Sequence, residues 1–244
     1  MTVDLNSFAA PIRVAVIGAA GGIGGALADI LREHERVAAL YAFARGNASG
    51  DCLFIDLEDE GTIESAAEEI RRDGPLDLVF LATGILHHVD GLAPEKSFKA
   101  LDANALERLY RINAIGPALV AKHFLPLLAL DRRAVFAALA ARVGSIGDNR
   151  LGGWHSYRMS KAALVMLIRN LAIETARKNP KAICVALHPG TVDTNLSKPF
   201  QGSVSDRKLF APKKAADNLL RTIDGLEVGQ SGHHIAWDGN RVPF

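Results

Sequence analysis

The chain has 244 residues, and its 28 basic against 27 acidic residues give a formal net charge of +1. This length suits one large α/β domain, while the balanced charge, without runs of one sign, argues against a nucleic-acid or anionic-membrane surface. The longest uncharged stretch, at 14–28, contains five glycines and is too short to cross a bilayer. With two scattered cysteines, Cys52 and Cys184, and no basic leader at 1–11, the chain is expected in the cytoplasm with a small-molecule partner.

Strand-like and helix-like patterns alternate along the whole chain. In order, they predict a strand at 12–17, a helix at 22–34, strands at 37–43 and 53–55, a helix at 63–72, a strand at 76–82, a mostly helical region at 105–130, a strand at 134–140, a helix at 155–178, a strand at 182–187, a helix at 213–224 and a short strand at 233–237. The strands are continuously apolar, which is typical of parallel strands covered on both faces. We therefore predict a single domain over 1–244 with a doubly wound Rossmann fold and a predominantly parallel sheet. The segment at about 190–210 has no clear period and is predicted to be a functional substrate loop.

A glycine-rich turn follows the first predicted strand. Gly18, Gly22 and Gly24 have the spacing G-x-x-x-G-x-G, with Ile23 between the last two. Such a turn lets the backbone approach a pyrophosphate, and the helix that follows offers free N–H groups at its N-terminus. Because a strand precedes the turn and a helix follows it, we predict dinucleotide binding here rather than an ordinary tight turn.

The end of the second predicted strand indicates which dinucleotide is bound. An Asp or Glu at this place would accept hydrogen bonds from the adenosine ribose, but the sequence is Tyr41-Ala42-Phe43-Ala44-Arg45. A guanidinium is suited to a 2′-phosphate. Arg45 therefore favours NADP(H) over NAD(H), with a solvated loop residue as the alternative.

Tyr157 and Lys161 lie four residues apart in a predicted helix and share one helix face. At roughly 4 Å and an effective dielectric of about 20, an ammonium favours the phenolate by about 4 kcal/mol. Part of that energy would bring the tyrosine pKa from about 10 toward the range where general acids and bases work at neutral pH. The same spacing occurs on ordinary helix surfaces, so the pair gains its weight from the glycine turn.

With these residues in place, the chain resembles the short-chain dehydrogenase/reductase family, and within it the carbonyl-reductase-like branch that includes the C-factor proteins. The resemblance covers nearly the whole length. Beyond the glycine turn and the Tyr157 to Lys161 pair, it is carried by Asp56-Leu57, by Leu81-Ala82-Thr83-Gly84 where the family usually has N-N-A-G, by Asn113, and by His188-Pro189-Gly190 with Thr191 and Thr194.

The resemblance implies hydride transfer between NADP(H) and a carbonyl or alcohol, in a homodimer or homotetramer built through long helices. It implies that Tyr157 is the general acid and base, that Lys161 binds the nicotinamide ribose and lowers the tyrosine pKa, and that Asn113 holds a relay water or plugs a helix kink. Cofactor contacts are implied for Asp56 and Leu57 at the adenine, for Ala82, Thr83 and Gly84 along the cofactor, and for Pro189, Gly190, Val192 and Thr194 near the nicotinamide.

One departure concerns the serine that in this family normally bonds the substrate oxygen. Counting thirteen residues back from Tyr157 reaches Gly144, whereas matching the S-S-x-x-G pattern reaches Ala141, so neither position supplies a hydroxyl. Losing one such donor costs about 10²–10³ in rate, which predicts reduced activity. Ser145 is the nearest candidate replacement, and a loop serine that caps a turn is the favoured alternative for it.

Two functions remain open. The first is an NADP(H)-dependent carbonyl or alcohol oxidoreductase, and the second is a catalytically weakened dinucleotide-binding sensor or signalling protein of the C-factor type, which Ala141 permits. The histidine pairs at 87–88 and 233–234 lack a third ligand at a motif spacing, so no metal is predicted. Residues expected to border an apolar substrate pocket are Trp154, His155, Phe200 and Phe210.

Overall fold

The computed structural model describes residues 3–46, 52–88, 90–203 and 209–244. Its centre is an eight-stranded sheet with the strand order β10-β9-β6-β5-β4-β1-β2-β3. The strands are β1 (Ile12–Ile17), β2 (Val37–Ala44), β3 (Leu53–Phe54), β4 (Leu78–Leu81), β5 (Ala134–Leu139), β6 (Ala182–His188), β9 (His234–Ala236) and β10 (Arg241–Val242). Neighbouring strands run parallel except β9 and β10. This confirms the predicted, predominantly parallel Rossmann fold.

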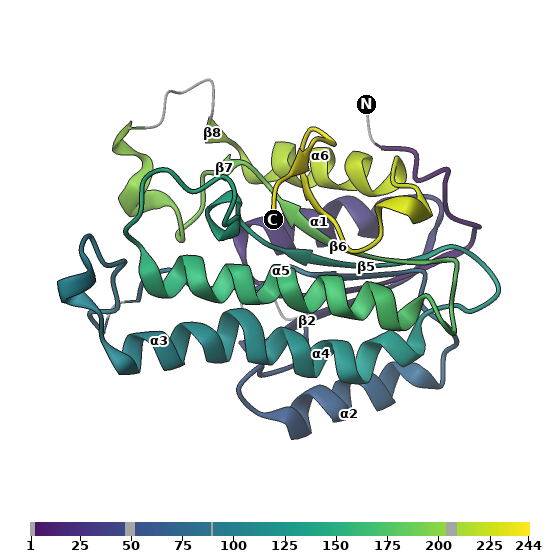
Figure 1. The fold of residues 1–244 in the computed structure, drawn as a ribbon. Coiled ribbons are helices and arrows are strands. Elements are labelled where there is room, and N and C mark those ends of the chain that lie inside the picture. Colours follow the sequence, from purple (N-terminus) through teal and green to yellow (C-terminus); the bar gives the residue numbers. More distant parts are fainter. Residues whose placement is uncertain (1–2, 47–51, 89, 204–208) are drawn as a thin grey trace.

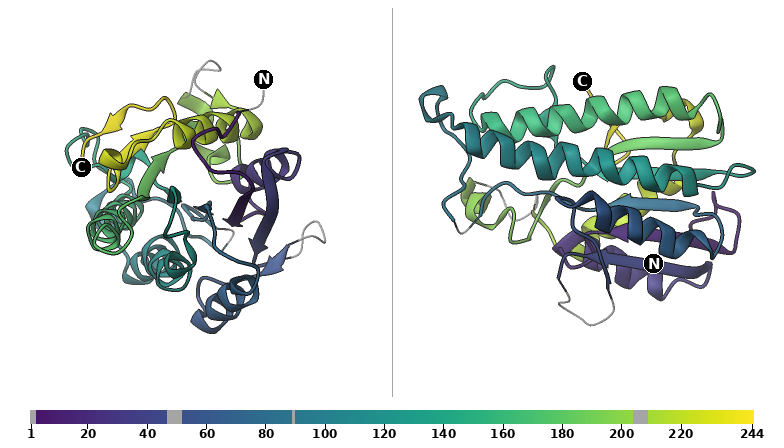
Figure 2. Two further views of the ribbon diagram at one scale, coloured as in Figure 1. Left: turned by 90° about the vertical axis from the view of Figure 1, so that its right-hand side faces the viewer. Right: turned by 90° about the horizontal axis from the view of Figure 1, so that it is seen from below.

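Helices cover both faces of the sheet (Figures 1 and 2). The helices α1 (Gly22–Arg32) and α6 (Pro212–Asp224) pack on one face, and α2 (Glu60–Arg71), α4 (Gly116–Phe124) and α5 (His155–Thr175) pack on the other. The helix α3 (Ala103–Tyr110) leads into α4 and lies beside the start of α5.

The continuous apolar strands follow from this two-sided covering. In β1, Val14 and Val16 belong to the core under α1 and α6, whereas Ala15 and Ile17 belong to the core under α2, α4 and α5. All four side chains are fully buried. A strand with both faces buried has no polar face, which explains why its sequence does not alternate.

Two predicted regions show detail that the sequence did not indicate. The region 105–130 is mostly helical, as predicted, with a π-helical turn, Arg111–Ile115, between α3 and α4. The segment 190–210 contains the short strands β7 (Thr191–Val192) and β8 (Leu209–Phe210), which pair with each other, and a 3-10 helix, Lys198–Ser203. Residues 204–208 of this predicted loop lie outside the described residues. Within the described ranges, no helix is long and apolar enough to cross a membrane.

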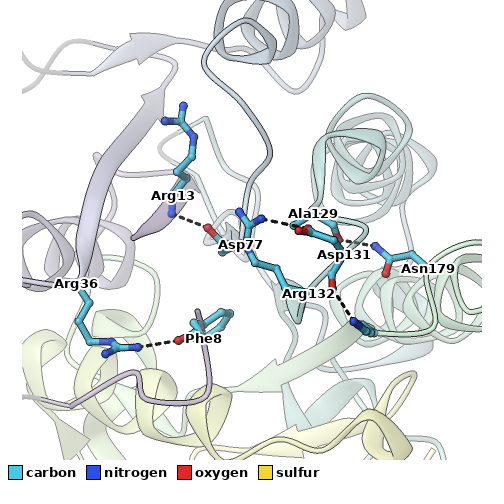
Figure 3. A network of polar contacts seen from close by, with 9 residues as sticks. Phe8, Arg13, Arg36, Asp77, Ala129, Asp131, Arg132 and Asn179 are labelled. Carbon is cyan, nitrogen blue, oxygen red and sulfur yellow. Dashed lines mark hydrogen bonds and ion pairs between the residues drawn. The ribbon is translucent and has the colours of Figure 1, made fainter. Parts of the chain in front are cut away.

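The amino ends of the strands are fixed by buried polar contacts (Figure 3). The carboxylate of Asp77, just before β4, is fully buried and accepts hydrogen bonds from the Arg13 backbone N–H at 2.8 Å and from Arg132 Nε at 2.6 Å. Asn179, before β6, donates to the Ala129 carbonyl at 2.8 Å. These contacts pair buried polar groups that would otherwise destabilise the fold, and they leave the carboxyl ends of the strands for the site.

Candidate active site

A long groove lies at the carboxyl ends of β1, β4, β5 and β6, where the strand order reverses between β1 and β4. It consists of two adjoining hollows of about 570 Å³ and 230 Å³. The hollows share Ala20, Gly21, Ala82, Thr83, Gly84 and Ile85. Ligands of doubly wound proteins bind at this crevice, and an elongated groove with two ends fits a dinucleotide. A hollow of about 680 Å³ beside α1 shares none of these residues and is lined mainly by charged side chains.

The glycine turn is shaped by close packing. Gly18 has φ +95°, and a Cβ there would lie 2.7 Å from the Ala82 carbonyl oxygen. A Cβ on Gly24 would lie 2.1 Å from the Gly18 oxygen, and one on Gly22 would lie 2.6 Å from Thr194 Cγ2. All three contacts are too short for a side chain, so glycine is needed for α1 to reach the strand ends.

The start of α1 has no side-chain cap and no acidic residue in its first turn. Its first backbone N–H groups, which have no partner within the helix, are therefore not capped by a side chain. The positive end of the helix dipole is likewise not balanced by an acidic side chain of the first turn. Gly22 and Ile23 line the groove at this point. The arrangement fits the pyrophosphate of a dinucleotide.

The smaller hollow has the charges expected at the adenosine end. Arg45, Asp56 and Leu57 line it, as predicted, together with Glu58. Arg45 Nη1 lies 3.4 Å from Glu58 Oε2, and both side chains are exposed. A 2′-phosphate would have to compete with Glu58 for the Arg45 guanidinium.

The larger hollow contains the Tyr157 and Lys161 pair. Both residues lie in the first two turns of α5 and are buried. Lys161 Nζ lies 6.0 Å from the centroid of the Tyr157 ring and donates to the Leu139 carbonyl at 2.9 Å. A Cβ on Gly84 would lie 3.0 Å from Lys161 Nζ and 3.1 Å from Asn113 Oδ1. Gly84 thus lies against both the Lys161 and the Asn113 side chains, and it lines the larger hollow together with Tyr157 and Lys161.

The fold does not give the predicted fall in the Tyr157 pKa. Burial raises the pKa of the Tyr157 phenol above its ordinary value, and burial lowers the pKa of Lys161 to about 8. Helix spacing alone predicts only the attraction between the two groups, whereas desolvation disfavours the charged form of both. The ammonium is also turned to the Leu139 carbonyl rather than to the phenol oxygen.

Asn113 is buried within the π-helical turn and makes three hydrogen bonds. Its Oδ1 accepts from the Ile85 N–H at 2.9 Å, and its Nδ2 donates to the Ile85 carbonyl at 2.9 Å and to Ser160 Oγ at 3.1 Å. The side chain therefore joins the turn after β4 to α5. This geometry matches the second role expected for Asn113, that of a side chain whose hydrogen bonds fill a helix kink.

Neither candidate position for the substrate-binding serine, Ala141 or Gly144, carries a hydroxyl. Ala141 follows β5 and packs in the apolar cluster that contains Tyr157 and Leu86. Gly144 instead lies against α5, where a Cβ would be 2.8 Å from the Lys161 carbonyl carbon. Ser145 is buried and its Oγ accepts from the Asp148 N–H at 3.1 Å. The loop serine therefore caps a turn, and it is not among the described residues that line the groove.

Aromatic side chains pack beside Tyr157 and form a wall there; His87 lines the larger hollow, whereas Trp154 and Phe200 are not among its described lining residues. The Trp154 ring lies 6.3 Å from Tyr157 and 4.9 Å from Phe200, both edge to face. His87 lies 5.7 Å from Phe200, and its Nε2 lies 3.0 Å from the Asn195 carbonyl. This bond joins the turn after β4 to the substrate segment, a contact that no local pattern predicts.

The other predicted residues divide into two groups. Pro189 and Thr194 line the larger hollow. Gly190 and Val192 are not among its described lining residues; a Cβ on Gly190 would lie 2.8 Å from Phe210, and Val192 pairs with Phe210 in the small sheet. Phe210 packs on Trp237 at 4.7 Å and so anchors the segment. Lining residues missed from the sequence include Ile85, Leu86, Leu139 and Ala140, whereas Asp193, Asn195 and Leu196 lie in the predicted substrate loop.

The fold and the groove are those of the dinucleotide-binding α/β class. Residues 13–203 match the short chain dehydrogenase family, and the chain belongs to that family. It is 32% identical over 232 residues to the 1-hydroxy-2-glutathionyl-2-methyl-3-butene dehydrogenase of Rhodococcus sp. (strain AD45), covering 93% of this chain and 96% of the relative. It is 35% identical over 144 residues to the C-signal protein of Myxococcus xanthus, covering 59% of this chain and 81% of that protein.

Solved structures confirm the fold. The NADPH-bound carbonyl reductase from chicken fatty liver superimposes with a TM-score of 0.83 at 23% identity, covering 97% of this chain and 100% of that structure. The carbonyl reductase Sniffer of D. melanogaster superimposes with a TM-score of 0.81 at 22% identity and the same coverage. The match over residues 13–203 confirms the predicted family, and these structures confirm the fold.

Proposed function

We propose that this chain is an NADP(H)-dependent oxidoreductase that interconverts a carbonyl and an alcohol by hydride transfer, with Tyr157 as the general acid and base. The observation that carries the proposal is that Tyr157 and Lys161 line the groove that begins at the glycine turn, where Gly84 lies against both Lys161 and Asn113. Neither the pair nor the turn would be sufficient alone.

When bound, NADP(H) supplies or accepts the hydride. The start of α1 would hold its pyrophosphate, and Asp56 and Leu57 would border its adenine. Lys161 donates to the Leu139 carbonyl among the described residues, and its ammonium has further donors for ribose hydroxyls. Pro189 and Thr194 would border the nicotinamide end.

The proton step belongs to Tyr157. Burial raises the pKa of its phenol, so the hydroxyl is protonated at neutral pH. It can give its proton to a carbonyl oxygen as negative charge develops there. Trp154, Phe200 and Leu86 keep water from this oxygen, which strengthens the electrostatic interactions inside the site. In alcohol oxidation the phenol oxygen would take the proton back.

The NADP(H) preference rests on Arg45. The guanidinium lines the proposed adenosine end of the groove, and among the described residues it pairs with the exposed Glu58 carboxylate at 3.4 Å. An exposed ion pair of this kind contributes about 0–1 kcal/mol. A doubly charged 2′-phosphate at close range should therefore displace Glu58.

A second candidate function is a catalytically weakened dinucleotide-binding sensor or signalling protein. It is favoured by Ala141, because the described groove offers no hydroxyl in the serine position and the Ser145 hydroxyl is held by Asp148. The similarity to the C-signal protein over 144 residues is consistent with it. The retained Tyr157, Lys161 and Asn113 favour the enzyme.

Turnover of NADPH separates the two candidates. Purified protein is assayed for NADPH oxidation with aldehydes, quinones and diketones, and for NADP⁺ reduction with alcohols that include a hydroxy-glutathionyl compound. We expect turnover with at least one, its loss in Tyr157→Phe, and its retention in Tyr41→Phe, whose hydroxyl contacts Arg13 and Asp73 away from the groove. Tight NADPH binding without turnover, unchanged by Ala141→Ser, would establish the sensor instead.

A further inference from the structure

The catalytic helix α5 begins without a cap of its own. Its N-cap residue is Trp154, which has no side-chain oxygen, and its first turn contains no acidic residue. Helix starts usually carry Ser, Thr, Asp or Asn at this position, because their oxygens accept the free N–H groups of the first turn. An uncapped start matters here because Tyr157 is the third residue of the helix.

The missing cap comes from Glu95, about sixty residues earlier in the chain. Its carboxylate accepts from the Ser156 backbone N–H, at 3.2 Å to Oε2, and from the Ser156 hydroxyl. Glu95 is 6% exposed and Ser156 is fully buried. A buried carboxylate is tolerated only where its hydrogen bonds are satisfied, and a negative charge at this end of a helix is favoured by the dipole.

The backbone of Glu95 holds the residue in front of the helix as well. The Trp154 N–H donates to the Glu95 carbonyl at 2.6 Å. Trp154 has φ +51° and follows two glycines, Gly152 and Gly153, that also have positive φ. A tryptophan in the left-handed region costs about 1–3 kcal/mol and persists only where its surroundings hold it. The Glu95 carbonyl is one such restraint.

Both bonds act on residues that flank the reacting phenol. Ser156 immediately precedes Tyr157, and the Trp154 ring lies 6.3 Å from the Tyr157 ring and 4.9 Å from Phe200. We propose that Glu95 is a positioning residue of the catalytic site, which sets Tyr157 through Ser156 and the aromatic substrate wall through Trp154. This proposal rests on the proposed function, because it assigns Tyr157 the proton step.

The test compares Glu95→Ala, Glu95→Gln and the control Glu68→Gln, which removes an exposed charge on α2 that pairs with Arg71. A displacement of about 1 Å costs roughly 10²-fold in rate, so Glu95→Ala should lower kcat for the carbonyl by about tenfold to a hundredfold and leave the Kd for NADPH within about twofold. Glu95→Gln should restore most of kcat, because its amide can accept from the Ser156 N–H and donate to the Ser156 hydroxyl. Glu68→Gln should match the parent.

A merely structural cap would lower thermal stability in Glu95→Ala without changing kcat per folded molecule, and that result would overturn the proposal. Equal losses of kcat in both Glu95 variants would overturn it too. If Glu95→Ala does not fold, Ser156→Ala removes one of the two side-chain bonds and should lower kcat about threefold; an unchanged kcat there contradicts the proposal.

If the protein shows no turnover, the proposed function is refuted, but kcat cannot then report whether Glu95 positions Trp154. Acrylamide quenching of Trp154 fluorescence then provides the readout, in a Trp237→Phe background and with NADPH bound. Glu95→Ala should increase the quenching, whereas Glu68→Gln should not. Unchanged quenching in Glu95→Ala would show that Glu95 does not hold Trp154 in the aromatic wall.

Discussion

Ala141→Ser should raise the rate of carbonyl reduction. Ala141 has an extended backbone, with φ −147° and ψ 142°, a conformation that serine adopts without strain. Its side chain is half-buried in the cluster with Tyr157, so a hydroxyl there would face the reacting oxygen. A fully preorganised donor contributes about 10²–10³ in rate. An introduced one lacks supporting contacts, and we expect an increase in kcat of about tenfold to a hundredfold.

The assay is the initial rate of NADPH oxidation at saturating NADPH and carbonyl, with the free energy of unfolding measured for each variant. Ser145→Ala is the matched control. It removes a hydrogen bond to the Asp148 N–H and should lower stability by about 1 kcal/mol with kcat unchanged. If Ala141→Ser leaves kcat unchanged while Ser145→Ala abolishes it, Ser145 is the donor and the assignment of the empty position to Ala141 is wrong.

Two further predictions concern charge. Glu58→Gln should tighten NADPH binding several-fold and leave NADH binding unchanged, because it frees Arg45 from its carboxylate partner; equal effects on both cofactors in a binding titration would exclude Arg45 as a phosphate ligand. Burial lowers the pKa of Lys161 from 10.5 to about 8 in the folded chain. Between these pH values the unfolded chain binds more protons than the folded chain, so the free energy of unfolding should rise with pH, by at most about 3 kcal/mol. Burial also raises the pKa of Cys184 from 9.0 to about 11, and this shift makes the free energy of unfolding fall with pH. Urea unfolding of the parent is therefore compared with that of Lys161→Met, in which the Lys161 contribution should disappear.

The parts of the site that could be predicted are those with a local cause. The turn at 18–24 is visible because a backbone that packs within 3 Å of another backbone admits only glycine. The Tyr157 to Lys161 pair is visible because helical spacing places both on one face. The sheet order follows from alternating strands and helices, since parallel strands require crossovers.

The parts that could not be predicted depend on contacts between distant segments. His87 and Asn195 are 108 residues apart, and Asn113 bonds Ile85 across 28 residues. Neither contact changes the periodicity of its own segment, so the π-helical turn and the aromatic wall leave no local pattern. Glu95 reads as an ordinary exposed acid beside Lys96, and only the fold reveals its burial.

The departure from the N-N-A-G pattern can be explained in the same terms. Leu81 is a fully buried strand residue, and Ala82 contributes to the turn mainly through its backbone, which faces Gly18. Only Gly84 has a conformation, φ +153°, and a neighbourhood, with Lys161 Nζ and Asn113 Oδ1 near 3 Å from a Cβ, that exclude other side chains. The positions that differ from the family pattern therefore contribute through core packing or mainly through their backbone, whereas a side chain at position 84 would meet Lys161 Nζ and Asn113 Oδ1.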